Sequence, residues 1–160
     1  MGDGHRSYDD LIKVPLLFSG VTIPKEHLIS KQVRHVDIFP TILDLIGIKS
    51  SVDVDGKSLI PIIKGIETEE RLACIESPPS VHGESQKTIG LRTSKYKYIR
   101  DLENSGKIIE LYDLENDPLE EINIADSKSD IVNFMENSLL KFRKNIVIEE
   151  QENMDDDEIS

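Results

Sequence analysis

The first ten residues, MGDGHRSYDD, combine carboxylate and imidazole side chains, which are types that bind divalent cations. Carboxylate and imidazole groups are common ligands of calcium and of transition metals. Carboxylates near a chain end are more often solvated than gathered around an ion, so this cluster alone predicts no metal site. The residues concerned are Asp3, His5, Asp9 and Asp10.

The chain has one cysteine, Cys74, in the stretch RLACIES. This apolar run is bounded by charge on one side and by two prolines on the other, which is typical of a buried strand. We therefore predict that Cys74 is a small apolar side chain in the interior rather than a nucleophile. A single cysteine forms no internal disulfide, so the sequence gives no sign of an oxidising compartment.

The charge of the chain is concentrated at its C-terminus. The formal net charge is -12, and the last twelve residues carry seven acids and no base, which leaves -12 + 7 = -5 on residues 1–148. We expect residues 149–160 to form a disordered acidic tail. The remainder lacks a basic stripe, which argues against a nucleic-acid partner.

No stretch reaches the roughly 18 apolar residues of a membrane helix, and the N-terminus is too polar for a signal peptide. The expectation is therefore a cytoplasmic protein that makes no use of a membrane.

The elements that must position any functional residue follow an α/β order. Residues 14–18 form a continuous apolar run, which predicts a strand covered on both faces. From Asp37, helical spacing of apolar residues predicts a helix of about ten residues, with Asp37 as N-cap and Gly47 as its left-handed end. A short helix or turn is expected around Pro61, and a second strand over residues 71–77.

From residue 88 onward, alternating patterns and a hairpin link, ENSG, predict two or three antiparallel strands. Tyr96 and Tyr98 are expected to pack the sheet, with Lys95 and Lys97 in water; an anion-binding basic face is the weaker alternative. Residues 127–146 then predict a terminal helix capped by Ser129 or Asp130, from the spacing of Ile131, Phe134, Met135, Leu139 and Phe142.

Four segments in this order resemble the C-terminal third of the sulfatases, members of the alkaline phosphatase superfamily. They are VPLLFSG, VRHVDIFPTILDLIGI, DVDGKSLIPIIKG and LRTSKYKYIRDLENSGKIIELYDLENDPLEEINIA, and together they cover about residues 8–126. The resemblance implies the C-terminal part of an alkaline-phosphatase-like fold, with a partial mixed sheet and helices, a small antiparallel sheet and a terminal helix. Residues 1–87 would be the end of the catalytic domain and residues 88–148 a small C-terminal subdomain.

The resemblance also implies a chemistry whose central parts we do not find in this sequence. The family uses a formylglycine made from the first residue of a CxPxR or SxPxR motif, beside a divalent cation, usually calcium. Here CIESP begins at Cys74 and SPPSV at Ser77, and neither matches. We therefore expect the chain to hold no cofactor of its own, to be inactive alone, and to need an N-terminal catalytic segment.

By the same resemblance, His5 and Arg6 lie near the mouth of the active site, although GDGH departs from the family's GDH or GEH by one position. His82 falls in a loop that borders the substrate pocket in sulfatases. We expect these three residues at the pocket rim, with His82 toward the substrate, and no metal ligand in the chain.

Three functions stay open at this point. The chain is a fragment of a sulfuric ester hydrolase, a fragment of a phosphodiester or phosphonate ester hydrolase of the same superfamily, or a non-catalytic interaction module. An unpaired sheet edge also predicts self-association.

Overall fold

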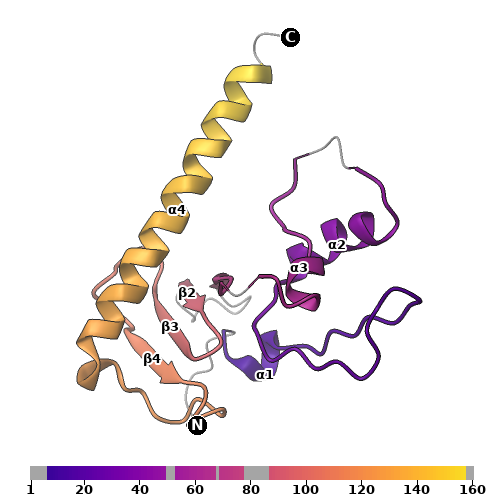
Figure 1. The fold of residues 1–160 in the computed structure, drawn as a ribbon. Coiled ribbons are helices and arrows are strands. Elements are labelled where there is room, and N and C mark those ends of the chain that lie inside the picture. Colours follow the sequence, from indigo (N-terminus) through magenta and orange to yellow (C-terminus); the bar gives the residue numbers. More distant parts are fainter. Residues whose placement is uncertain (1–6, 50–52, 68, 78–86, 158–160) are drawn as a thin grey trace. The chain divides into compact units, whose positions relative to one another are not determined.

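The computed structural model describes residues 7–49, 53–67, 69–77 and 87–157, with side chains described as far as residue 144 (Figure 1). The chain divides into two compact units: residues up to Ile12 together with Cys74 onward form one, and Lys13–Ala73 form the other. The first unit is thus discontinuous in sequence.

The first unit is built on a four-stranded sheet in the order β1-β2-β3-β4. The strands are β1 (Ala73–Ser77), β2 (Thr88–Arg92), β3 (Tyr96–Asp101) and β4 (Glu110–Asp113). β3 pairs antiparallel with both β2 and β4. The predicted strand at 71–77 and the predicted antiparallel strands after residue 88 are therefore confirmed.

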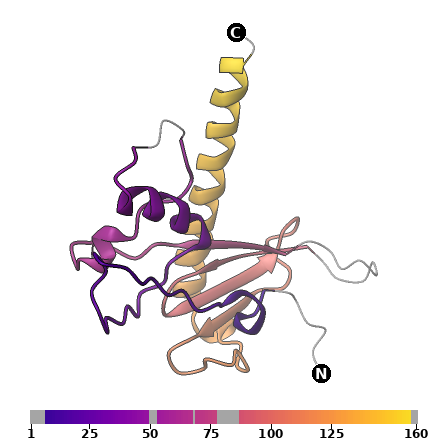
Figure 2. The ribbon, with the colours of Figure 1, turned by 90° about the vertical axis from the view of Figure 1, so that its right-hand side faces the viewer.

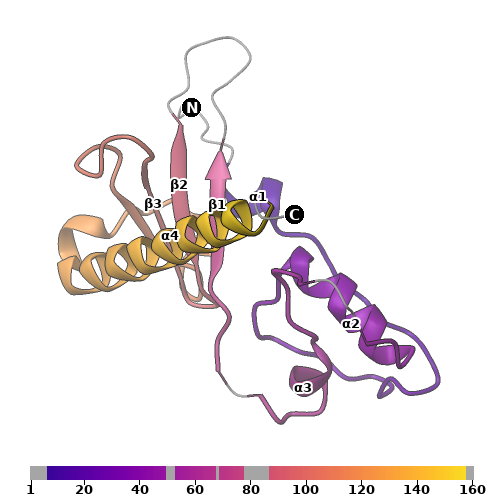
Figure 3. The ribbon, with the colours of Figure 1, turned by 90° about the horizontal axis from the view of Figure 1, so that it is seen from above.

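Helix α4 (Ser129–Asp157) lies across one face of this sheet, as Figure 3 shows. Met135 and Leu139, four residues apart on one helix face, are fully buried. Figure 2 shows the helix running on beyond the strands. The sequence predicted a tail from residue 149, and the backbone is helical as far as residue 157, in keeping with the helix propensity of Glu, Gln and Met.

The core of this unit lies between the sheet and α4. A short N-terminal helix, α1 (Asp9–Ile12), has no buried residue. The apolar side chains of the unit that are buried to 5% exposure or less are Ile89, Leu91, Tyr98, Ile99, Leu111, Tyr112, Met135 and Leu139.

The second unit holds the 3₁₀ turn η1 (His35–Asp37) and the helices α2 (Ile38–Leu45) and α3 (Ile60–Ile63). The helix predicted from Asp37 is confirmed, and so is its stop, since Gly47 has φ +74°. The short helix expected near Pro61 is also present, with the proline in its first turn.

The prediction of a buried strand at residues 14–18 is wrong for this chain, since these residues form no strand. Leu17 is 84% exposed and Val14 53%. A strand needs a neighbour for its N–H and C=O groups, and none of the described segments pairs with this one. None of the helices in the described part of the chain combines the length and the apolar content that crossing a bilayer requires.

Candidate functional site

The three residues predicted at the pocket rim, His5, Arg6 and His82, all lie outside the described residues. The structure does describe where their segments are attached. Ser7, which follows Arg6 in the chain, is fully buried, and its hydroxyl lies 3.2 Å from the hydroxyl of Thr88. Thr88 begins β2, six residues after His82. The two segments that carry the candidates therefore join the sheet at adjacent points.

Residues 7–12, which we call the N-terminal strap, are held by a buried lysine. Lys97 on β3 has no exposed surface, and its Nζ lies 2.5 Å from Asp9 Oδ1 and 2.6 Å from Glu120 Oε1. The same nitrogen donates to the carbonyl oxygen of Ser7 at 3.1 Å. The prediction that Lys97 points into water is therefore wrong, because its charge is matched inside the protein by two carboxylates.

Asp9 of the strap is also held by Arg92 on β2. The Arg92 guanidinium donates to both Asp9 carboxylate oxygens, at 3.0 and 2.7 Å. The backbone N–H of Asp9 donates to Glu120 Oε2 at 2.6 Å. Two cations and two carboxylates thus form a cluster of formal charge zero, which we call the strap cluster.

The environment of Asp9 favours its ionised form. Burial by itself raises the pKa of this carboxyl, but the hydrogen bonds from Arg92 and Lys97 outweigh it and lower the pKa to about 2. Asp9 is therefore a permanent anion near neutral pH, and both of its oxygens are occupied by cationic side chains. This leaves it poorly suited to bind a metal ion.

Aromatic side chains continue the same interface. The rings of Tyr8 and Tyr112 meet edge to face, with centroids 6.0 Å apart. Both hydroxyls donate to Glu110 Oε2, at 3.3 Å from Tyr8 and 3.0 Å from Tyr112. Burial, with the nearby acids, raises the pKa of the Tyr8 hydroxyl, so it stays protonated and remains a donor.

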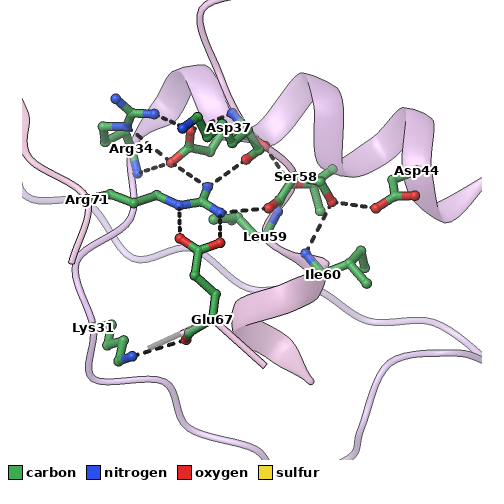
Figure 4. A network of polar contacts seen from close by, with 11 residues as sticks. Lys31, Arg34, Asp37, Asp44, Ser58, Leu59, Ile60, Glu67 and Arg71 are labelled. Atoms are coloured by element: carbon green, nitrogen blue, oxygen red, sulfur yellow. Dashed lines mark hydrogen bonds and ion pairs between the residues drawn. The ribbon is translucent and has the colours of Figure 1, made fainter. Parts of the chain in front are cut away.

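A second polar network lies within Lys13–Ala73 and is shown in Figure 4. At its centre, the fully buried carboxylate of Asp37 accepts hydrogen bonds from the Arg34 side chain at 2.8 Å and from the Lys57 N–H at 3.0 Å. Arg71 lies 3.3 Å from the same carboxylate. The predicted capping role of Asp37 needs correction, because its side chain makes no capping hydrogen bond to α2.

Arg71 connects Asp37 to three further residues of this network. Its guanidinium donates to the carbonyl oxygens of Lys57 and Ser58, at 2.7 and 2.8 Å, and pairs with Glu67 at 2.7 Å. Because almost every donor of the guanidinium is used on the protein itself, Arg71 serves the fold rather than a ligand.

Thr41 and Gly56, which belong to the family motifs, make structural contacts near the same network. The Thr41 hydroxyl accepts the Leu59 N–H at 2.8 Å and donates to the Asp37 carbonyl at 2.5 Å. Gly56 lies so close to η1 that a Cβ there would meet the Val36 carbonyl oxygen at 1.8 Å. The stretches VDIFPT and DGKSL are therefore two halves of one structural contact.

Cys74 lies half-buried on β1. Burial, reinforced by the negative charge of Glu76, raises the pKa of its thiol and disfavours the thiolate that nucleophilic chemistry requires. In the part of the chain that the structure describes, no three His, Cys, Asp or Glu side chains gather in a way that could hold a metal ion. The described residues therefore do not fit the divalent cation that the resemblance implies for the complete enzyme.

Sequence reasoning missed the importance of Lys97, Glu120 and Arg71. Lys97 and Glu120 are 23 positions apart and are charged residues of the kind found on surfaces. Their only shared signal is the presence of opposite charge, which is too common to select a pair.

Comparison with known proteins gives these motifs a context. Residues 3–145 match the family model described as N-sulphoglucosamine sulphohydrolase, C-terminal. Arylsulfatase K of Mus musculus is 32% identical over 124 residues, which is 74% of this chain and 22% of that protein. The chain thus spans about a quarter or less of the length of this relative.

Solved structures of a sulfatase and of a phosphonate monoester hydrolase also superimpose on this chain. The structure of a 2-O GAG sulfatase superimposes with a TM-score of 0.58 and 27% identity, covering 68% of this chain and 24% of that one. Phosphonate monoester hydrolase of Agrobacterium radiobacter superimposes with a TM-score of 0.51 and 26% identity, over the same shares of the two chains.

Proposed function

Because this chain belongs to the sulfatase family and corresponds to its C-terminal portion, with that family's α/β fold, we propose that it braces the catalytic domain of a sulfuric ester hydrolase and borders its substrate pocket. In this role it contributes scaffold and rim, and the reacting groups come from an N-terminal catalytic segment. Sulfated sugars are the substrate class that the matched family model and the 2-O GAG sulfatase suggest.

The observation that carries the proposal is the apolar surface of Lys13–Ala73. Among the residues whose side chains the structure describes, seventeen large apolar side chains are exposed, and eleven of them belong to this unit. They are Val14, Leu16, Leu17, Val21, Leu28, Val36, Phe39, Ile42, Ile46, Ile48 and Ile66. Burying one such side chain stabilises a protein by about 1.5 to 3 kcal/mol. A partner that covers this surface would therefore bury more apolar side chains than one that covers the other unit.

The covering partner that we propose is the catalytic segment of the same enzyme. Residues 14–18 have the composition of a strand buried on both faces, and such a strand pairs within a larger sheet. In the absence of that partner, we expect the same surface to drive self-association.

For the pocket rim we propose His5, Arg6 and, toward the substrate, His82. The support is the shared point of attachment: the Ser7 hydroxyl lies 3.2 Å from Thr88, so both segments are anchored at one place on β2. A cationic rim suits a sulfate ester, because arginine and protonated histidine donate charge-assisted hydrogen bonds to its oxygens.

The nucleophile and the cation are assigned to the catalytic segment. The sequences beginning at Cys74 and Ser77 lack the spacing of the formylglycine motif, and Asp9 is occupied by Arg92 and Lys97. Calcium or another divalent cation is therefore expected from ligands in that segment, and the 160 residues alone are expected to hydrolyse no ester.

The test is reconstitution. The purified chain, an N-terminal sulfatase segment carrying CxPxR, and their mixture are assayed with an aryl sulfate in the presence of calcium. Turnover is expected in the mixture alone. Turnover by the 160 residues on their own would contradict the proposal, and so would an inactive mixture in which the two segments bind each other.

A second candidate is a phosphonate or phosphodiester hydrolase of the same superfamily, favoured by the likeness to phosphonate monoester hydrolase. The same mixture assayed with a phenyl phosphonate ester distinguishes the two. A larger kcat/KM for the phosphonate would select this alternative. Tight binding without turnover of either ester would select a non-catalytic interaction module.

A further inference from the structure

We infer that Lys97 is a positioning residue, which fixes the register of the N-terminal strap on the sheet and thereby the point where the pocket rim begins. This inference rests on the proposed function, in which His5 and Arg6 border the substrate pocket. Ser7 directly follows these two residues in the chain, and its carbonyl oxygen accepts a hydrogen bond from Lys97.

The first support is a row of three cross-strand neighbours. In the sheet register, Lys97 on β3 is opposite Arg92 on β2 and opposite Tyr112 on β4. All three bind the strap: Lys97 binds Ser7 and Asp9, Arg92 binds Asp9, and Tyr112 packs on Tyr8. Side chains of directly opposite residues lie on the same face of a sheet, so the row forms one continuous seat.

The second support is that the seat is specific to one register. Asp9 is paired with two cations, and its own N–H is bound by Glu120. Sliding the strap so that Tyr8 lies against Lys97 and Arg92 would leave these two buried charges without the Asp9 carboxylate. Sliding it the other way would bring Asp10 to them but would move Ser7 away from Thr88 and Tyr8 away from Tyr112. An unpaired buried charge is costly, so the polar contacts select the register.

The third support is the chemistry of the lysine itself. Its ammonium group donates a hydrogen bond to the carbonyl oxygen of Ser7 and forms ion pairs with the carboxylates of Asp9 and Glu120. An apolar side chain of similar length would fill the same space and preserve the burial, but it would provide no preference for where Ser7 and Asp9 lie. The position of the strap therefore depends on the charge of Lys97 more than on its volume.

The test compares Lys97→Met with Lys95→Met. Lys95 is the matched control, since it lies two positions away, is 46% exposed on its side chain, and makes one ion pair, with Glu115 at 3.2 Å. Amide hydrogen exchange is measured in the 160-residue chain. We expect exchange at residues 7–12 to accelerate about tenfold or more in Lys97→Met, with β2 and β3 still protected and with no change in Lys95→Met.

A second variant, Lys97→Met with Glu120→Gln, guards against unfolding by an unpaired carboxylate. It is expected to keep the sheet protected and still to release the strap. Strap protection equal to that of the unaltered chain in either folded variant would overturn the positioning role.

The consequence for catalysis is read separately, in the enzyme reconstituted with its catalytic segment. Displacing the rim in Lys97→Met is expected to raise KM about tenfold or more. A loss of folded protein alone would lower the apparent kcat and leave KM unchanged. Faster strap exchange with an unchanged KM would reject the role of the strap in substrate binding while retaining its anchoring by Lys97. An inactive reconstituted enzyme that carries the unaltered chain would instead reject the proposed function.

Discussion

The carboxylate of Asp37 lies 3.3 Å from the guanidinium of Arg71, and both side chains are almost completely buried. Each also binds the backbone of Lys57: Asp37 accepts the Lys57 N–H, and Arg71 donates to the Lys57 carbonyl oxygen. The backbone donor and the backbone acceptor of this one residue are therefore bound by side chains of opposite charge. This contact holds three separate stretches of Lys13–Ala73 together, in a unit whose buried apolar side chains, among the described residues, are Leu59 and Ile62.

Replacing Asp37 by alanine is expected to destabilise the chain strongly, because Arg34 and Arg71 would lose a buried anion. Removing one partner of a buried ion pair costs about 3 to 5 kcal/mol. Urea unfolding followed by circular dichroism measures the change. The control is Asp44→Ala, at an exposed acid that accepts one hydrogen bond, from the Ser58 hydroxyl at 2.6 Å. Equal losses in the two variants would contradict the central place of Asp37.

Adding one methyl group at Gly56 is expected to destabilise the same unit. A Cβ there would lie 1.8 Å from the Val36 carbonyl oxygen, which forces the DGKSL stretch away from η1. Overpacking of this kind costs about 1 to 3 kcal/mol. Gly20→Ala is the matched control in the same unit, since its Cβ would meet only Ile23 at an ordinary 3.7 Å. Thermal melting of both variants tests the prediction, and a Gly56→Ala melting temperature equal to that of Gly20→Ala would refute it.

The strap cluster is expected to make stability depend on pH in the acid range. The pKa of Asp9 falls from its ordinary value of 3.8 to about 2 in the folded chain, so folding favours the ionised form. The contribution, about 2 kcal/mol, is present in full above pH 4 and is lost as pH falls toward 2. The Asp9→Asn variant should lack this contribution of Asp9 to the pH dependence of stability.

Unfolding free energies measured between pH 6 and pH 2 give the comparison for this prediction. The gap between the unaltered chain and Asp9→Asn should narrow as pH falls. The exposed neighbour Asp10, replaced by Asn, is the control. A gap that stays constant across this range would show that Asp9 is not held as an ion by Arg92 and Lys97.

Charge on the apolar surface of Lys13–Ala73 is expected to reduce self-association. Leu17 is 84% exposed, so Leu17→Asp removes apolar contact area without opening a cavity in the fold. Sedimentation velocity over a range of concentrations should show a weaker shift toward dimers and larger species. Leu119→Asp, at a 75% exposed leucine of the other unit, should leave the association unchanged. Unaltered association in Leu17→Asp would place the contact elsewhere.

Local patterns in this sequence predict the local structure well. The spacing after Asp37, the left-handed Gly47 and the alternation after residue 88 each depend on neighbours a few positions away, and the corresponding elements are present. The family was also visible in the ordered motifs, since these record contacts such as Thr41 with Leu59 that the fold requires.

What could not be predicted depends on residues far apart in the chain. Lys97 alternates with tyrosines on a strand and was expected in water, but its partners Asp9 and Glu120 come from segments 88 positions before and 23 after it. The prediction for residues 14–18 is wrong for a related reason. Their composition is typical of a buried strand, but whether a strand is buried depends on a neighbouring segment, which local composition does not reveal. Pairing of distant charges and strands is set by tertiary structure.

The discontinuous make-up of the first unit has a consequence for peptide-bond cleavage. Its strap and its sheet are joined through the whole of Lys13–Ala73, yet they are also held directly by Ser7 with Thr88 and by Asp9 with Arg92 and Lys97. A protease that nicks the intervening residues would therefore produce two polypeptides that stay associated. The short one would remain docked as a peptide ligand of the long one.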